Sequence, residues 1–171
     1  MAVLAGEAML IHAMAAGAAL DPARVVVVAG HGAEAVRTAV LAHDPEAQVV
    51  IQAEQLGTAH AVAQAAPALD GFAGDAVVLY GDTPFIRPET LARMAQARAR
   101  HDIVVLGFEA ADPGRYGRLV MADDDLERIV EFKDATEAER AITLCNSGVV
   151  MAAAPVLFDL VEAVGNDNAA G

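Results

Sequence analysis

Short runs of consecutive apolar residues alternate with longer, mixed segments over the first hundred residues of the chain. Three runs are wholly apolar, as strands buried on both faces of a parallel sheet are: 25–28, 49–51 and 76–79. Four segments of helical length mix apolar with polar or charged residues and are predicted as helices: 8–20, 33–43, 59–66 and 88–100. This alternation predicts an α/β fold in which a mostly parallel sheet is flanked by helices.

After residue 102 the pattern changes to closely spaced strands. The predicted strands are 103–108, 118–121, 126–131 and 144–151, and a last helix is predicted over 155–164. Residues 165–171 have the composition of a loop. Because no repeat, linker or low-complexity segment interrupts the pattern, residues 1–171 are predicted to form a single domain.

Three helix starts carry signals of their own. Thr58 is well placed to cap the helix over 59–66. Pro88 stands at the first position of the helix over 88–100, where the missing N–H costs nothing. Thr136 and Glu139 have the spacing of a capping box and predict a short helix between the later strands.

Charge and cysteine content argue against several classes of protein, namely nucleic-acid-binding, disulfide-bonded and membrane-spanning proteins. A formal net charge of −13 argues against a nucleic-acid partner, because affinity for nucleic acid comes mostly from Lys and Arg contacts to phosphate. The single cysteine, Cys145, excludes an internal disulfide and fits a reducing compartment. The apolar start carries Glu7 and lacks a basic segment, and no apolar run is long enough for a membrane span. A soluble, cytoplasmic protein without a membrane partner is predicted.

A single carboxylate follows the central predicted strand. Asp82 comes directly after Tyr80 and Gly81, and Pro84 stops the strand. The carboxyl ends of strands in an open α/β sheet are where ligands bind, and Gly81 allows a ligand close to the backbone. The alternative, that Asp82 only accepts hydrogen bonds from loop amides, is equally compatible with the sequence.

The loop over 52–57 concentrates residues suited to a nucleotide. The Gln52 amide can pair with both the donor and the acceptor edge of a base. Gly57 allows close approach, and a helix starting near Thr58 presents free N–H groups. Polar packing within the loop is the alternative, but the density of such residues favours ligand binding.

Another glycine pair matches the dinucleotide-binding fingerprint in outline. Gly30, Gly32 and Ala35 follow a strand and open a helix, with Glu54 downstream. A nicotinamide-binding module is therefore an alternative function. Because the fingerprint normally sits on the first strand, a plain strand–turn–helix junction is the favoured interpretation.

Other clusters of titratable residues give weaker signals. Three adjacent carboxylates at 123–125 cannot all converge on one cation, so this run is predicted to be a solvated turn. The five histidines have no zinc-site spacing and are predicted to be ordinary surface or core residues, and Cys145 has no evident activator.

Five blocks occur in the same order and spacing as in one enzyme family: 52–61, 79–86, 116–118, 129–136 and 146–148. On these blocks the chain closely resembles the uridyltransferase domain of the bacterial bifunctional N-acetylglucosamine-1-phosphate uridyltransferase/glucosamine-1-phosphate acetyltransferase. The resemblance covers essentially the whole chain. It implies a Rossmann-like nucleotidyltransferase that makes UDP-N-acetylglucosamine from UTP and N-acetylglucosamine 1-phosphate, with Mg²⁺, for cell-wall synthesis.

The resemblance also implies roles for individual residues. Gln52, Gly57 and Thr58 would hold the uracil. Tyr80 and Gly81 would line the nucleotide–sugar pocket. Asp82 would ligate Mg²⁺ as the one catalytic carboxylate. The residues expected to contact the N-acetylglucosamine moiety are Gly117, Glu131 and Asn146.

The chain departs from the family pattern at both ends. Ahead of Met1 the family has a first strand and a glycine-rich, basic phosphate loop, and after Gly171 a second magnesium ligand and a β-helical domain that trimerises. The comparison predicts a partial domain that lacks the family's first strand and transfers uridylyl groups poorly. A catalytically silent fragment that still binds sugar nucleotide is a further alternative.

Overall fold

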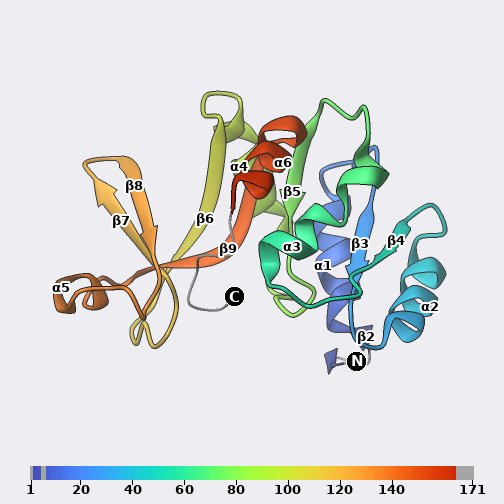
Figure 1. Ribbon diagram of the computed structural model, residues 1–171, viewed down its shortest axis with the longest axis horizontal. Coiled ribbons are helices and arrows are strands. Elements are labelled where there is room, and N and C mark those ends of the chain that lie inside the picture. The colour runs from blue at the N-terminus through green and yellow to red at the C-terminus, as the bar shows by residue number, and fades with distance from the viewer. Residues whose placement is uncertain (1, 5–6, 165–171) are drawn as a thin grey trace.

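The computed structural model describes residues 2–4 and 7–164 and confirms an α/β fold (Figure 1). Two strands, β3 (Val26–Ala29) and β4 (Gln48–Ile51), form a parallel pair. A five-stranded sheet contains β5 (Asp75–Val78), β6 (Ile103–Glu109), β7 (Arg118–Ala122), β8 (Asp125–Val130) and β9 (Leu144–Ala153). The strands lie within a few residues of their predicted positions.

The pairing of β9 corrects the expectation of a mostly parallel sheet. Both β5 and β6 pair with β9 antiparallel, so they run in the same direction as each other but are separated by a strand of opposite direction. The reason lies in the connection: β9 follows a hairpin and a short helix, not a crossover helix, and returns through the sheet from its far end. Parallel pairing is found between β3 and β4.

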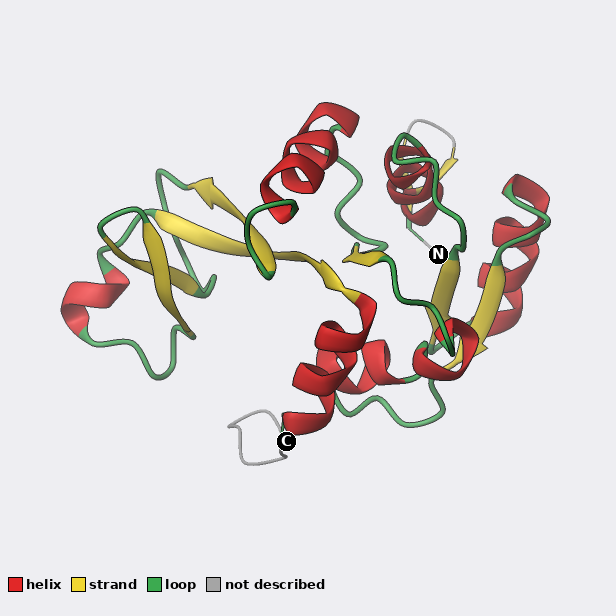
Figure 2. Ribbon diagram, turned by 90° about the horizontal axis from the view of Figure 1, so that it is seen from above, coloured by secondary structure: helices red, strands yellow, loops and turns green. Residues whose placement is uncertain are grey.

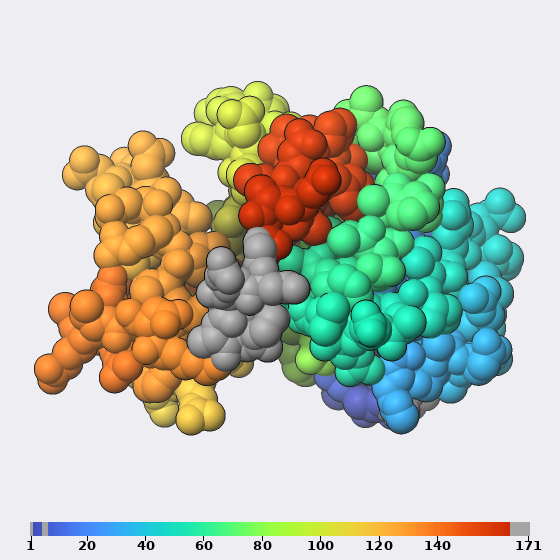
Figure 3. Space-filling model, viewed as in Figure 1, coloured from blue at the N-terminus to red at the C-terminus, as the bar shows by residue number. Residues whose placement is uncertain are grey.

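Helices cover both faces of the strands. On one face α1 (Met9–Ala18) contacts α2 (Ala33–His43) and α4 (Pro88–Arg98). On the other, α6 (Ala154–Ala163) contacts α3 (Thr58–Ala63), and their surfaces adjoin in Figure 3. A 3₁₀ turn spans Ala66–Leu69. None of the helices that the structure describes is long and apolar enough to cross a bilayer.

Two apolar clusters lie under the first face. Buried Val27 and Val40 join β3 to α2, with Leu10 packed against them. Buried Leu91 and Met151 join α4 to β9. Together these clusters bury α1, α2 and α4 against strands of both sheets, so the two sheets share one layer of helices.

The β7–β8 hairpin extends away from the rest of the chain, and β9 connects it to the helices (Figure 2). Its turn pairs Ala122 with Asp125, and Asp123 adopts a φ of 55°. The run 123–125 is exposed, and no group of three or more His, Cys, Asp or Glu side chains in the described part of the chain can hold a metal. The prediction of a solvated turn is confirmed.

The capping box is confirmed at α5 (Glu137–Arg140). The Thr136 Oγ1 and backbone N–H both donate to Glu139 Oε2, at 2.6 and 2.7 Å, and Glu139 N–H donates back to Thr136 Oγ1. Arg128 contacts the other carboxylate oxygen of Glu139. The bonds from Thr136, followed by Arg128, lower the pKa of Glu139 from its ordinary 4.5 to about 2.

This lowered pKa predicts a stability change in acid. Because the folded state binds the Glu139 proton less tightly than the unfolded chain, the contribution is full above pH 4.5 and declines as the pH falls toward about 2. Urea unfolding at pH 6 and pH 3 should show a smaller acid loss of stability in Glu139→Gln than in the parent chain. Glu137→Gln, on the same helix, is the matched control and should retain the parent's loss. An unchanged loss in Glu139→Gln would contradict the prediction.

Other helix starts are confirmed or corrected. Pro88 stands at the first position of α4, as predicted. Thr58 is not a cap: α3 begins at Thr58 itself, and the cap is Gly57, with φ 98° and no side-chain bond. A φ in this region favours glycine, so the backbone of Gly57 makes the turn and leaves the Thr58 side chain exposed.

The N-terminal residues form a small antiparallel pair, β1 (Val3–Leu4) with β2 (Glu7–Ala8), which the sequence pattern does not predict. Helix α1 follows at Met9. Among the described residues, no strand pairs with both β3 and β5. The predicted loop over 165–171 lies outside the described residues.

Candidate functional site

A cavity of about 1170 Å³ is lined by β3, by β5 and by the segments that follow β3, β4 and β5. Six of the predicted site residues line it: Gln52, Gly57, Thr58, Tyr80, Gly81 and Asp82. They come from two segments, one after β4 and one after β5. The structure therefore brings the predicted uracil-binding loop and the predicted metal ligand to one cavity.

Gln52 is oriented by its own loop and by α3. Its Nε2 lies 3.3 Å from the Gly57 carbonyl and 3.0 Å from His60 Nδ1. His60 in turn contacts Gln64, one helical turn further on, at 3.1 Å. The half-buried Gln52 amide nitrogen is thus held by two partners, which leaves its carbonyl oxygen as the atom available to a ligand.

Asp82 lies in the turn after β5 and is exposed. The turn is closed by Thr83, whose N–H and hydroxyl both donate to the Tyr80 carbonyl, at 3.2 and 3.0 Å. No described residue donates a hydrogen bond or forms an ion pair with the Asp82 carboxylate. The interpretation of Asp82 as an acceptor for loop amides therefore finds no support in the geometry.

The carboxylate of Asp82 suits a magnesium ion shared with a substrate. Mg²⁺ usually binds through one or two carboxylates together with substrate phosphates, so it needs no cage of protein ligands. A single exposed carboxylate in the lining of the cavity matches that requirement.

Tyr80 crosses from β5 toward β9. A Cβ built on Gly148 would lie 2.7 to 2.9 Å from three atoms of the Tyr80 ring and hydroxyl, so the ring rests directly on this glycine. Gly148 also adopts φ +83°, a conformation that favours glycine. The Asn146 Oδ1 accepts from the Gly148 N–H at 2.9 Å and links the ring to the next group of residues.

The three predicted sugar contacts lie together. Asn146 N–H donates to the Gly117 carbonyl at 2.8 Å, and the Glu131 carboxylate lies beside Gly117, 3.0 Å from where a Cβ would stand. They come from three strands or their ends: β7, β8 and β9. The arrangement forms a continuous series of contacts from Tyr80 through Gly148 to Asn146, Gly117 and Glu131.

A bulge in β9 positions Asn146. Val150 pairs with Val105 and Asn146 with Gly107. Between these two pairs β9 contains two more residues than β6, which is the bulge. Bulges next to functional sites redirect side chains, and glycine within a strand is a sequence signal for them. Here the Ser147 hydroxyl fixes the bulge by donating to the Leu106 carbonyl at 2.7 Å.

Arg118 holds the loop before Gly117 in place, and sequence reasoning missed this role. Its side chain is buried, with 1% exposure. The guanidinium donates to the carbonyls of four residues, Pro113, Gly114, Tyr116 and Arg140. His60 and Gly148 are further residues whose roles were not predicted, because each depends on a partner distant in the sequence.

The glycines of the dinucleotide fingerprint have a local explanation. Gly32 caps α2 with φ 71°, and no atom lies within 4 Å of where its Cβ would stand. Gly30 packs against Gln55, 3.2 Å from a built Cβ. A turn and a close contact account for both glycines, which favours the plain strand–turn–helix interpretation.

Comparison with known proteins shows the family of the chain. The family model for the MobA-like NTP transferase domain matches residues 1–165. The chain is 67% identical over 168 residues to the bifunctional protein GlmU of Ruegeria pomeroyi, and 70% identical over 163 residues to that of Cereibacter sphaeroides. These matches cover 98% and 95% of the chain but 37% and 36% of the relatives, so the chain spans little more than a third of their length.

Solved structures support the fold. HddC from Yersinia pseudotuberculosis, complexed with GMP-PN, matches with a TM-score of 0.70 at 22% identity, over 93% of this chain and 68% of that one. A putative glucose-1-phosphate thymidylyltransferase from Bacillus anthracis matches with a TM-score of 0.74 at 16% identity, over 92% and 63%. The predicted resemblance is confirmed at the level of these relatives. The chain is a nucleotidyltransferase domain and belongs to the MobA-like NTP transferase domain family.

Proposed function

We propose that this domain binds uridine nucleotide sugars and serves uridylyl transfer from UTP to N-acetylglucosamine 1-phosphate. The observation that carries the proposal is that Gln52, Gly57 and Thr58 line the same cavity as Asp82. A base-pairing amide after β4 and a lone carboxylate after β5, both lining one cavity, suit the two ends of a nucleotide. The high identity to bifunctional GlmU proteins supports the same substrate class.

The residues fit a reaction in which the protein aligns the two substrates and supplies no nucleophile of its own. A phosphate oxygen of the sugar phosphate attacks the α-phosphorus of UTP, the new P–O bond forms, and pyrophosphate leaves with the electrons of the broken bond. When bound, Mg²⁺ neutralises phosphate charge. Asp82 would hold the ion, and the Gln52 carbonyl oxygen would receive the N3–H of uracil.

The second group of residues would bind the sugar. Asn146 donates to Gly117, which lies beside Glu131. These three residues do not line the cavity, but Tyr80, which does, reaches them through Gly148. A carboxylate accepts hydrogen bonds from sugar hydroxyls, and an amide donates or accepts as needed. We place the protein in the cytoplasm, where sugar nucleotides are made, and assign oligomerisation to parts of the longer relatives.

We also infer that the described chain transfers uridylyl groups slowly. Arg24 is the one Lys or Arg among the described residues that line the cavity. It lies just before β3, at the opposite end of that strand from the segments after β4 and β5, and donates to the carbonyls of Ala68 and Asp70. Because the described lining of the cavity offers no other Lys or Arg, it supplies little stabilisation to the charge of the transferring group.

Calorimetric titration with UDP-N-acetylglucosamine and with NAD⁺ tests the substrate class. We expect the sugar nucleotide to bind and Gln52→Ala to weaken it about 10-fold, the loss of one or two hydrogen bonds. Gln48→Ala, an exposed glutamine at the other end of β4, is the control and should leave binding unchanged. NAD⁺ binding that is lost in Gly32→Val, without any response to the uridine nucleotide, would favour the nicotinamide module instead.

A further inference from the structure

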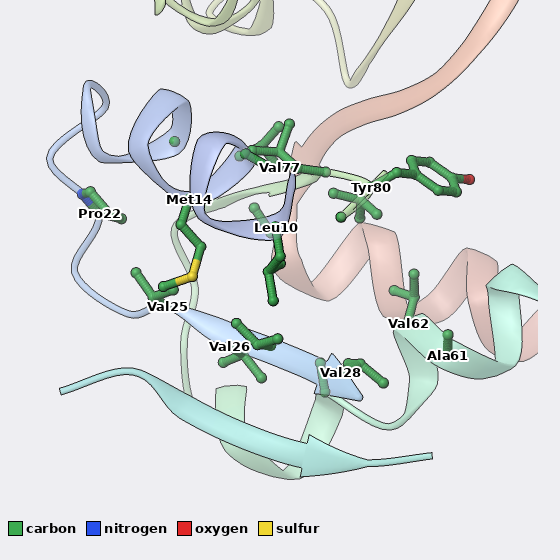
Figure 4. A pocket seen from close by; sticks show the side chains of 18 of the residues that line it. Leu10, Met14, Pro22, Val25, Val26, Val28, Ala61, Val62, Val77 and Tyr80 are labelled. Atoms are coloured by element: carbon green, nitrogen blue, oxygen red, sulfur yellow. The ribbon is translucent and has the colours of Figure 1, made fainter. Parts of the chain in front are cut away.

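Three polar side chains form a continuous series of contacts that starts at the cavity. Gln52 lines the cavity, but His60 and Gln64 are not among the described residues that line it. In their place α3 presents Ala61 and Val62 to the cavity (Figure 4). The Gln52 Nε2 lies 3.0 Å from His60 Nδ1, and the Gln64 Nε2 lies 3.1 Å from His60 Nε2. The imidazole therefore joins a glutamine at the cavity to a second glutamine outside its lining.

The helix explains why His60 and Gln64 meet. They are four positions apart, so they lie on the same side of α3. Gln64 is the C-cap of this helix and keeps helical dihedral angles, φ −63° and ψ −21°. Its amide nitrogen also donates to the His60 carbonyl at 3.2 Å, so the side chain folds back along the helix onto the ring. All three side chains of the series are half-buried.

A neutral imidazole cannot accept hydrogen bonds from both glutamines. One of its nitrogens donates and the other accepts. Both amide nitrogens face the ring, and an amide nitrogen only donates. One of the two amides must therefore turn its oxygen to the ring N–H. The orientations of Gln52 and Gln64 are thus coupled through His60, because when one amide donates to the ring, the other accepts from it.

Two arrangements satisfy this rule. In the first, the Gln52 nitrogen donates to His60 Nδ1 and to the Gly57 carbonyl, and the amide oxygen at position 64 accepts from the ring Nε2–H. In the second, the Gln64 nitrogen donates to the ring Nε2 and to the His60 carbonyl, and the Gln52 oxygen accepts from Nδ1–H. Each arrangement makes three hydrogen bonds within the protein, two from the donating amide and one to the accepting amide. The ligand and the residue at position 64 therefore decide between them.

The two arrangements present opposite groups to a ligand. The first leaves the Gln52 carbonyl oxygen available in the cavity lining, as an acceptor, and the second leaves the amide N–H groups, as donors. Uracil carries a hydrogen on ring atom N3 and donates there, whereas N3 of cytosine has no hydrogen and accepts. The first arrangement therefore suits uracil, and the second suits cytosine.

We propose that His60 and Gln64 are positioning residues that set which atom of Gln52 faces the base, and so decide between uracil and cytosine. The inference rests on the proposed function, because it takes Gln52 as the residue that meets the base. It goes beyond that function in assigning base choice to Gln64, which acts on the base only through His60 and Gln52. A residue at position 64 that can only donate holds the second arrangement and favours cytosine.

Gln64→Lys tests the proposal, because an ammonium group only donates. The parent chain and the variant are titrated calorimetrically with UDP and with CDP at about pH 8.5, above the range in which histidine usually takes up a proton. We expect the ratio of the CDP to the UDP dissociation constant to fall at least about 10-fold in Gln64→Lys, since uracil N3–H would then meet a donor. Both nucleotides carry the same diphosphate, so any effect of the added charge cancels in the ratio.

A matched variant and a spectroscopic measurement separate positioning from a merely structural role. Gln64→Met keeps the length of the side chain but removes its donor and acceptor, so it should keep the parent's ratio. Nitrogen-15 NMR reports which nitrogen of the His60 ring carries the proton. We expect the proton on Nε2 in the UDP complex of the parent chain and on Nδ1 in the CDP complex of Gln64→Lys.

The outcomes distinguish this inference from the proposed function. If the parent chain binds UDP but the ratio is unchanged in Gln64→Lys, or changes equally in Gln64→Met, the positioning role is overturned and the proposed function stands. A ring proton that moves to Nδ1 without a change in the ratio would also overturn it, since Gln52 would then not follow the ring. Failure of the parent chain to bind UDP or UDP-N-acetylglucosamine would overturn the proposed function, and this inference with it.

Discussion

Asp82→Asn is expected to reduce pyrophosphate release from UTP and N-acetylglucosamine 1-phosphate by about 10³-fold. The change removes a charge and keeps the volume, so it weakens the hold on Mg²⁺ without altering packing around an exposed turn. Several kcal/mol of lost charge stabilisation correspond to such a factor, because each 1.36 kcal/mol is tenfold. The assay compares this chain with one that also carries the family's glycine-rich segment ahead of Met1, and we expect measurable turnover in the longer chain.

Asp159→Asn, an exposed carboxylate on α6, is the matched control for the charge change. It should leave turnover unchanged. Near-normal turnover of Asp82→Asn at ordinary Mg²⁺ would assign the metal to another residue. Equal turnover of the short and the long chain would show that the phosphate site lies within the described residues.

Gly148→Ala is expected to destabilise the fold by about 3 kcal/mol and to displace Tyr80. The added Cβ would meet three Tyr80 atoms at 2.7 to 2.9 Å, and the φ of +83° is unfavourable for alanine. Chemical denaturation measures the cost, and near-ultraviolet circular dichroism reports the tyrosine environment.

Two comparisons separate the two causes. Gly114→Ala has φ +47° but nothing within 4 Å of its Cβ, so it should cost only about 1 kcal/mol of backbone strain. In a Tyr80→Ala background, Gly148→Ala should cost a similar amount, because the clash is gone. An undiminished cost in that background would show that the ring and Gly148 do not interact.

Much of the fold follows from local patterns in the sequence. The apolar run at 25–28 is predicted as a strand and is β3 to within one residue, and Thr136 and Glu139 form their capping box. These features depend on neighbours in the chain, where periodicity and spacing are informative. Strand order is not local: nothing in the composition of 144–151 tells that β9 lies between β5 and β6.

The candidate site divides in the same way. The resemblance names Gln52 and Asp82 through their motifs, and the structure brings both to one cavity. His60, which contacts Gln52 from α3, carries no zinc or catalytic spacing and was predicted to be ordinary. The role of Arg118 was missed because its partners are backbone carbonyls. Every residue has such a carbonyl, so the sequence does not indicate which ones Arg118 contacts.

The late position of β9 in the chain has a consequence for biosynthesis. In β9, Ala153 pairs with Asp75 of β5 and Ala152 pairs with Ile103 of β6. β5 and β6 are therefore synthesised before the strand with which they pair, which is the last strand of the described chain. On a ribosome that synthesises from the N-terminus, the sheet cannot close until β9 has emerged from the exit tunnel. Pairings so distant in sequence fold slowly, and β5 and β6 remain open to wrong partners throughout. Chaperone occupancy of nascent chains should therefore persist until translation has passed Ala153 by the length of the exit tunnel.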